Sequence, residues 1–253
     1  MLYGNDSIST YTRSNVSVWM AMAFQAGVLN IGAYLASHHF VSHVTGFATL
    51  FGNEVARADY PRAVGLLAVP ALFLIGAMIS GFLVDIRLKL KKKPKYYIVF
   101  GVMFFLTTMV VILGFNGVFG SFGNPLTVAR DYLLMAILCL ICGIQNGTIT
   151  SVSRSVVRTT HLTGILTDLG IGLVRVLNGT KIDGGVDEDA RANLMRLGLI
   201  SSFVLGSIVG GFLFPSAGFR GFLLPVLVSG ALFGVTLYFQ VLKRRNLKSL
   251  RTH

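Results

Sequence analysis

The chain has 253 residues and a net charge of +12, yet only 13% of its residues are charged and 53% are hydrophobic. A mean hydropathy of +0.71 excludes the mixed composition of an ordinary soluble domain. Half of the basic residues form two clusters beside apolar segments, which argues against nucleic-acid binding and favours anionic lipids as their partners. These clusters are Arg87, Lys89, Lys91, Lys92, Lys93 and Lys95, and Lys243, Arg244, Arg245, Lys248 and Arg251.

Several apolar segments are long enough to cross the roughly 30 Å hydrocarbon core of a bilayer as helices. The polar stretch before Trp19 lacks the pattern of a cleavable signal peptide, so we expect the first segment to remain in the membrane. The six long segments lie at 17–36, 63–86, 97–118, 131–150, 194–214 and 221–242. Two shorter, more polar segments lie at 40–56 and 160–177, and the acidic stretch 181–196 is predicted to be a solvated linker.

The distribution of charge predicts how the segments cross the membrane. The basic loop at 87–95 and the basic tail at 243–253 should both be cytoplasmic under the positive-inside rule. Four crossings between them satisfy this rule, whereas a fifth at 160–177 would place the tail outside. We therefore predict one all-α integral membrane domain with six long transmembrane helices, two short half or re-entrant helices, and both termini in the cytoplasm. Eight transmembrane helices in parallel repeats are the alternative.

An internal repeat relates residues 17–118 to residues 131–242. Three blocks recur in the same order, at offsets of 116, 118 and 130 residues. Gly27-Val28-Leu29-Asn30 matches Gly143-Ile144-Gln145-Asn146, Ser42-His43-Val44-Thr45-Gly46 matches Thr160-His161-Leu162-Thr163-Gly164, and 76–83 matches 206–213. Three crossings per copy would insert the second copy from the opposite side, which predicts two inverted-topology repeats as in many transporters.

The motifs FVSHVTGFATLFG at 40–52 and VRTTHLTGILTDLG at 157–170 resemble the YoaK-like family of bacterial membrane proteins, also designated DUF1275 or UPF0700. The resemblance covers nearly the whole chain, from about residue 17 to 242. It implies a multi-pass protein of the bacterial inner membrane. The family supplies no established substrate or activity, so no site residue can be carried over from it.

The polar residues that recur in both copies are the candidate substrate-binding residues. Threonines four positions apart share a helix face, and the glycine of each Thr-Gly pair permits close approach of the backbone. Hydrogen bonds between helices are the structural alternative, and the histidines could couple transport to protons or be passive. The candidates are Asn30, His43, Thr45, Thr49, Asn146, His161, Thr163, Thr167 and the unmatched Asp168.

Asp168 stands out because a carboxylate inside a membrane is costly and often functional. Its repeat mate is Leu50, and Arg175 lies two helical turns further on as a candidate partner. Arg154, Arg158 and Arg175 are also candidates for contacts with an anion or with lipid.

These features favour a small-molecule or ion permease, with its site between the two short polar helices at the repeat interface. A non-transporting membrane assembly or sensor protein is the alternative, and a homodimer is a further candidate assembly. An intramembrane enzyme has less support because the chain has no HExxH, GxSxG, paired aspartate or phosphate loop. No cofactor or metal is expected, and the Cys139-x-x-Cys142 pair is interpreted as packing.

Overall fold

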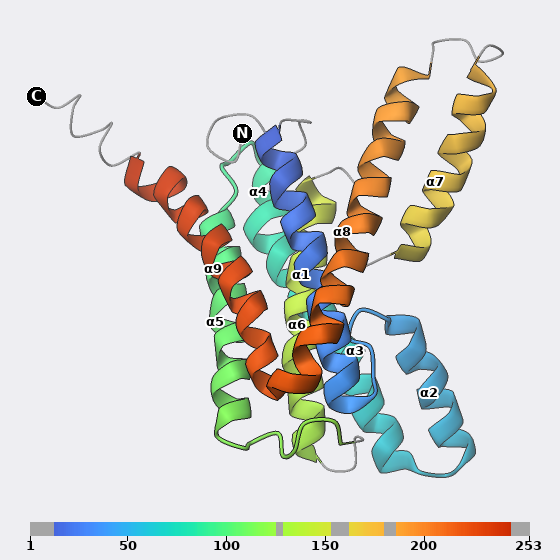
Figure 1. Cartoon of the computed structure of the whole chain (residues 1–253), viewed down its shortest axis with the longest axis vertical. Coiled ribbons are helices and arrows are strands. Elements are labelled where there is room, and N and C mark those ends of the chain that lie inside the picture. Colours follow the sequence, from blue (N-terminus) through green and yellow to red (C-terminus); the bar gives the residue numbers. More distant parts are fainter. Residues whose placement is uncertain (1–12, 125–128, 153–161, 180–185, 244–253) are drawn as a thin grey trace, which may run out of the picture.

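The computed structural model describes residues 13–124, 129–152, 162–179 and 186–243. All regular structure within these ranges is helical (Figure 1). The helices are α1 (Arg13–Ser37), α2 (Val44–Ala56), α3 (Tyr60–Ser80), α4 (Ile86–Lys89), α5 (Tyr96–Phe115), α6 (Ala129–Val152), α7 (Leu162–Leu177), α8 (Asp187–Ala217) and α9 (Leu223–Leu237). Short π-helical turns, η1 (Gly81–Asp85) and η4 (Tyr238–Leu242), extend α3 and α9, and a 3-10 turn, η3 (Gly218–Phe222), joins α8 to α9.

Five helical stretches among the described residues are long and apolar enough to cross a membrane. The fifth runs for 56 residues and contains both α8 and α9. Large apolar side chains on these helices face outward, with Phe82 73% and Phe212 82% exposed. A soluble protein rarely leaves so much apolar surface uncovered, so these helices indicate an integral membrane protein.

Most helix limits lie within a few residues of the predicted segments, but the linker predicted at 181–196 is wrong in its second half. Helix α8 begins at Asp187 and includes Asp189 and Asn193. Three acidic residues occupy its first turn, where the partial positive charge of a helix N-terminus stabilises carboxylates. The acidic residues that suggested a linker therefore favour the start of a helix.

The two short helices lie beside the long ones without running their full height. Helix α2 has 13 residues and α7 has 16, fewer than the roughly 20 that a membrane-spanning helix needs. In Figure 1, α2 starts near mid-height and runs toward the lower end, and α7 starts near mid-height and runs toward the upper end. The N-terminal ends of both helices therefore lie near the middle of the bundle.

Helices from the two halves of the chain pack tightly against each other, α1 against α8 and α3 against α6. Glycines allow this approach. A Cβ at Gly27 or Gly206 would overlap a backbone carbonyl oxygen across the α1–α8 contact. A Cβ at Gly143 or Gly76 would do the same across the α3–α6 contact. These are the glycines that the repeat aligns, and small residues of this kind let membrane helices pack closely.

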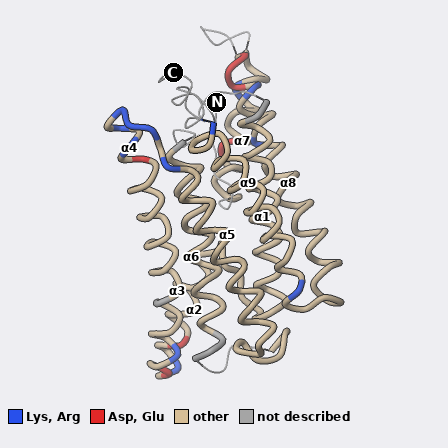
Figure 2. Tube along the Cα trace, turned by 90° about the vertical axis from the view of Figure 1, so that its left-hand side faces the viewer, with Lys and Arg blue, Asp and Glu red and all other residues tan. Residues whose placement is uncertain are grey.

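Charged residues gather at the two ends of the bundle (Figure 2). The basic stretch around α4 lies at the same end as the start of α1 and the end of η4 (Figure 1). There Lys89 pairs with Asp85 at 3.1 Å, and Arg87 Nε donates a hydrogen bond to the carbonyl oxygen of Lys93. At the opposite end, Asp59 caps α3 by accepting a hydrogen bond from the backbone N–H of Arg62.

Candidate functional site

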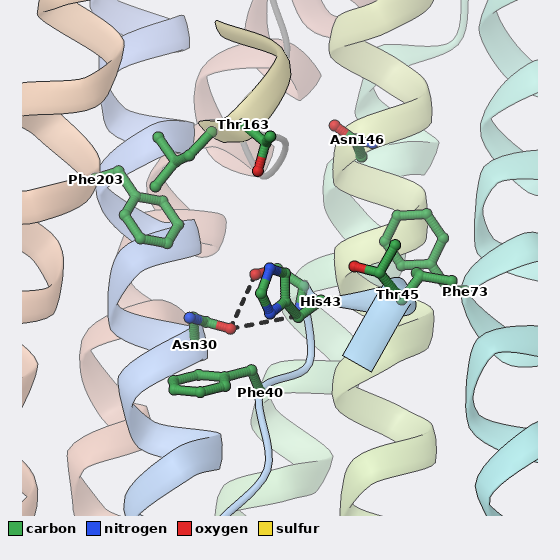
Figure 3. Close-up of a pocket in the computed structure, with 11 residues that line it drawn as sticks. Asn30, Phe40, His43, Thr45, Phe73, Asn146, Thr163 and Phe203 are labelled. Atoms are coloured by element: carbon green, nitrogen blue, oxygen red, sulfur yellow. Dashed lines mark hydrogen bonds between the residues drawn. The ribbon is translucent and has the colours of Figure 1, made fainter. Parts of the chain in front are cut away.

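A cavity of about 470 Å³ lies where the N-terminal ends of α2 and α7 approach the long helices (Figure 3). This volume is within the usual range of small-molecule sites. Its walls combine amide, hydroxyl and imidazole groups with aromatic rings. The lining residues are Asn30, Phe40, Ser42, His43, Val44, Thr45, Phe73, Asn146, Leu162, Thr163 and Phe203.

Eight of these eleven lining residues are repeat mates of one another. The pairs are Asn30 with Asn146, Val44 with Leu162, Thr45 with Thr163, and Phe73 with Phe203. Each pair has the offset of its own repeat block, 116, 118, 118 and 130 residues. The mates of the other three lining residues fall at 158, 160 and 161, outside the described residues. The cavity is therefore built by the same positions of both halves.

The two asparagines make different contacts although they are repeat mates. Asn30 Oδ1 accepts hydrogen bonds from the backbone N–H and the hydroxyl of Ser42, at 3.3 and 2.9 Å. These bonds tie the segment before α2 to α1. Asn146 Oδ1 is buried and has no hydrogen-bond partner among the described residues. An unpaired buried acceptor costs free energy, so Asn146 Oδ1 would gain from any hydrogen-bond donor that reached it.

The four candidate threonines divide into two kinds. Thr45 and Thr163 line the cavity from the first turns of α2 and α7. Thr49 and Thr167 lie outside it, and each hydroxyl donates to the carbonyl oxygen four residues earlier, at 3.1 and 2.9 Å. Of the two threonines predicted to share a face on each short helix, only the first therefore lines the cavity.

Asp168 lies outside the cavity on α7 and is partly buried. Pairing with Arg175, which the spacing suggested, does not occur. Arg175 Nη1 instead contacts Asp189 Oδ1 at 3.4 Å, across the α7–α8 contact. The α8 helix brings this carboxylate within reach because it begins at Asp187. Among the described residues, none forms an ion pair or hydrogen bond with Asp168.

His43 lines the cavity from the position just before α2. Its repeat mate His161 lies outside the described residues, as do the candidate anion contacts Arg154 and Arg158. The two cysteines are buried in α6, and Cys139 Sγ donates to the carbonyl oxygen of Val41 at 3.3 Å.

Sequence reasoning missed the aromatic walls of the cavity. Phe73 and Phe203 stand three residues before the matched glycines Gly76 and Gly206. Extending the third repeat block backwards would have found this pair. Phe40 has no such signal because its repeat position is occupied by Arg158.

Comparison with known proteins gives one match. The model of the family described as "Protein of unknown function (DUF1275)" matches residues 18–235. No curated protein and no solved structure matches the chain. Since the family model covers most of the chain, including every residue that lines the cavity, the protein belongs to the DUF1275 family.

Proposed function

We propose that the protein is a permease for a small polar solute or ion, and that the cavity between α2 and α7 is its binding site. The observation that carries this proposal is the lining of one cavity by four matched residue pairs from the two halves. Many secondary transporters place their sites at the interface of inverted repeats, beside discontinuous helices. In this proposal the chain has six spans, and α2 and α7 are re-entrant half-helices.

The starts of the two half-helices give the cavity its electrostatic character. The first N–H groups of a helix lack partners within the helix and carry partial positive charge. His43, at the start of α2, makes no capping hydrogen bond with its side chain. Val44 and Thr45 of α2, and Leu162 and Thr163 of α7, line the cavity. This arrangement favours solutes with electronegative oxygen atoms, such as carbonyl, hydroxyl or carboxylate groups.

The side chains of the cavity are consistent with a small polar solute. No Asp, Glu, Lys or Arg lines it within the described part of the chain. Amides and hydroxyls can exchange hydrogen bonds with a solute, and the rings of Phe73 and Phe203 can cover its apolar face. Weak contacts of this kind suit a protein that must release what it binds.

The proposed orientation places the protein in the bacterial inner membrane with both termini in the cytoplasm. The basic stretch around α4 lies at the same end of the bundle as the start of α1 and the end of η4. The positive-inside rule assigns that end to the cytoplasm. The ends of α1 and α8 that are joined to the segment 38–43 and to η3 would then face outward.

The test is uptake into proteoliposomes of a panel of labelled sugars, polyols, amino acids and monocarboxylates. We expect flux of at least one class. Replacing Thr45 and Thr163 together by Val should lower that flux about tenfold, the effect of losing about 1.4 kcal/mol of solute interaction. Replacing Thr49 and Thr167 by Val is the matched control, because it removes the same groups outside the cavity. Equal losses in both double variants would place the site elsewhere. A folded protein with no flux across the panel would favour an assembly or sensor role.

A further inference from the structure

A second, smaller cavity of about 160 Å³ adjoins the 470 Å³ cavity described above, which we call the central cavity. Two residues, Phe40 and His43, line both cavities and form their common wall. The smaller cavity lies within the segment that joins α1 to α2 and along the first turns of α2, and we call it the histidine cavity. It is lined by His38, His39, Phe40, His43, Gly46, Phe47 and Leu50.

The ring of Phe40 closes the central cavity on one side. Figure 3 shows it below Asn30 and His43, with Asn146 and Thr163 on the opposite side of the cavity. The ring stacks on Tyr34, with centroids 4.7 Å apart and planes 8° apart. It meets the His43 ring edge-on at 6.2 Å. Phe40 is nonetheless 42% exposed, so the ring is supported by a neighbour but is not enclosed by the core.

The backbone on either side of Phe40 is held by three anchors. His38 Nε2 is hydrogen-bonded to the carbonyl oxygen of Gly123 at 3.0 Å. Cys139 Sγ binds the carbonyl oxygen of Val41, and Asn30 binds Ser42. Because the backbone is fixed, rotation of the Phe40 side chain alone would change the opening between the two cavities. Side-chain rotation of this kind is fast compared with movement of a whole helix.

The histidine cavity offers polar contacts without the geometry of a metal site. Three imidazoles line it, and none of the described carboxylates does so. Within the described ranges, no group of three His, Cys, Asp or Glu side chains could hold a metal ion. His39 Nδ1 is already hydrogen-bonded to the carbonyl oxygen of Ser37. The cavity therefore suits brief hydrogen bonding to a small polar solute.

We infer that Phe40 is a gate between the central site and the histidine cavity, which forms the outer vestibule of the same pathway. This inference rests on the permease proposed above. In this role Phe40 would control access to the central site from the histidine cavity and limit the size of the solutes that enter. The gate belongs to one half of the chain only, because the repeat mate of Phe40 is Arg158.

The gate can be tested by cysteine accessibility, which needs no knowledge of the solute. The background carries Cys139→Ser, which keeps a donor for Val41, and Cys142→Ala. One reporter is Thr45→Cys, which lines only the central cavity, and the other is Leu50→Cys, which lines only the histidine cavity. A membrane-impermeant cationic thiosulfonate is added outside intact cells, and the rate of modification is measured at each reporter.

We expect Leu50→Cys to react from outside whatever residue occupies position 40. At Thr45→Cys, Phe40→Ala should raise the rate about tenfold and Phe40→Trp should lower it by a similar factor, as expected for a gated route. Phe105→Ala is the control, because Phe105 on α5 is 65% exposed and lines neither cavity, and it should leave the Thr45→Cys rate nearly unchanged. Phe40→Leu gives a milder opening, and the thermal unfolding midpoint in detergent reports whether each variant is folded.

Equal Thr45→Cys rates in Phe40→Ala and Phe40→Trp, with Leu50→Cys still reactive, would overturn the gate. An unreactive Leu50→Cys in a folded protein would overturn the vestibule. The same measurements separate the gate from the permease proposal. Solute flux without any dependence on Phe40 would keep the permease and remove the gate, whereas Phe40-dependent labelling without flux would keep the route and remove the transport function.

Discussion

Gly27 on α1 lies so close to the carbonyl oxygen of Phe203 on α8 that a Cβ at this position would overlap it. Its repeat mate Gly143, on α6, has the same relationship to the carbonyl oxygen of Phe73 on α3. Both phenylalanines also line the central cavity. These two close contacts between helices therefore position the aromatic walls of the candidate site.

Substituting these glycines should destabilise the fold. Gly27→Ala would push α1 away from α8, and overpacking of this kind costs about 1–3 kcal/mol. The control is Gly211→Ala on α8, where a Cβ would have no neighbour within 4 Å, and where alanine favours the helix by about 1 kcal/mol. Thermal unfolding in detergent should show a lower midpoint for Gly27→Ala only. Equal midpoints would mean that the close contact does not exist.

The two matched asparagines should respond differently to truncation. Asn30→Ala removes the acceptor for two hydrogen bonds from Ser42, at a cost of about 1 kcal/mol for each bond. Asn30→Gln keeps an uncharged amide acceptor and should restore part of the lost stability. Asn146→Ala removes a buried oxygen that has no partner among the described residues, so the thermal midpoint of this variant should be unchanged or higher. A lower midpoint for Asn146→Ala would show that this amide is bonded in the folded protein.

Arg175 should be energetically coupled to Asp189 and not to Asp168. The Arg175–Asp189 pair is 3.4 Å apart, and the two side chains are 58% and 28% exposed. Exposed pairs of this kind contribute about 0.2–1 kcal/mol. Double-mutant cycles of unfolding with Arg175→Met, Asp189→Asn and Asp168→Asn can measure both couplings. A larger coupling between Arg175 and Asp168 would contradict the arrangement of α7 and α8.

The proposed topology predicts which ends of the half-helices are reached from outside. Tyr60, after α2, is 61% exposed at the end opposite α4, whereas Glu188 is exposed at the start of α8. In a background of Cys139→Ser and Cys142→Ala, an impermeant maleimide added to intact cells should label Tyr60→Cys and spare Glu188→Cys until the cells are opened. If α2 and α7 crossed the membrane fully, four crossings would separate the two residues, so both would lie on the same side and would be labelled alike.

Much of the fold could be predicted because hydropathy and segment length are local properties. The segment predicted at 97–118 corresponds to α5 at Tyr96–Phe115, and 40–56 contains α2 at Val44–Ala56. The resemblance to the DUF1275 family is confirmed by the match over residues 18–235. The count of six spans stays a prediction, since length and composition mark five candidate stretches.

The contacts of single side chains could not be predicted because they depend on how distant helices pack. Nothing near Arg175 in sequence shows that Asp189 will lie closer than Asp168. Phe73 and Phe203 are ordinary apolar residues on apolar helices, and only the α1–α8 and α3–α6 contacts bring them to one cavity. Asn30, Thr45 and their mates could be predicted because polar groups are rare and recur in both copies.

The pairing of α1 with α8 and of α3 with α6 has a consequence for the origin of the chain. Each tight pair takes one helix from each half, so neither half contains a complete pair of its own. A single-copy ancestor could have formed these contacts only with a second molecule. Under the duplication that the sequence repeat predicts, gene fusion would have converted an obligate two-chain assembly into one chain, and each half could then carry residues that the other lacks, such as Phe40 and Asp168.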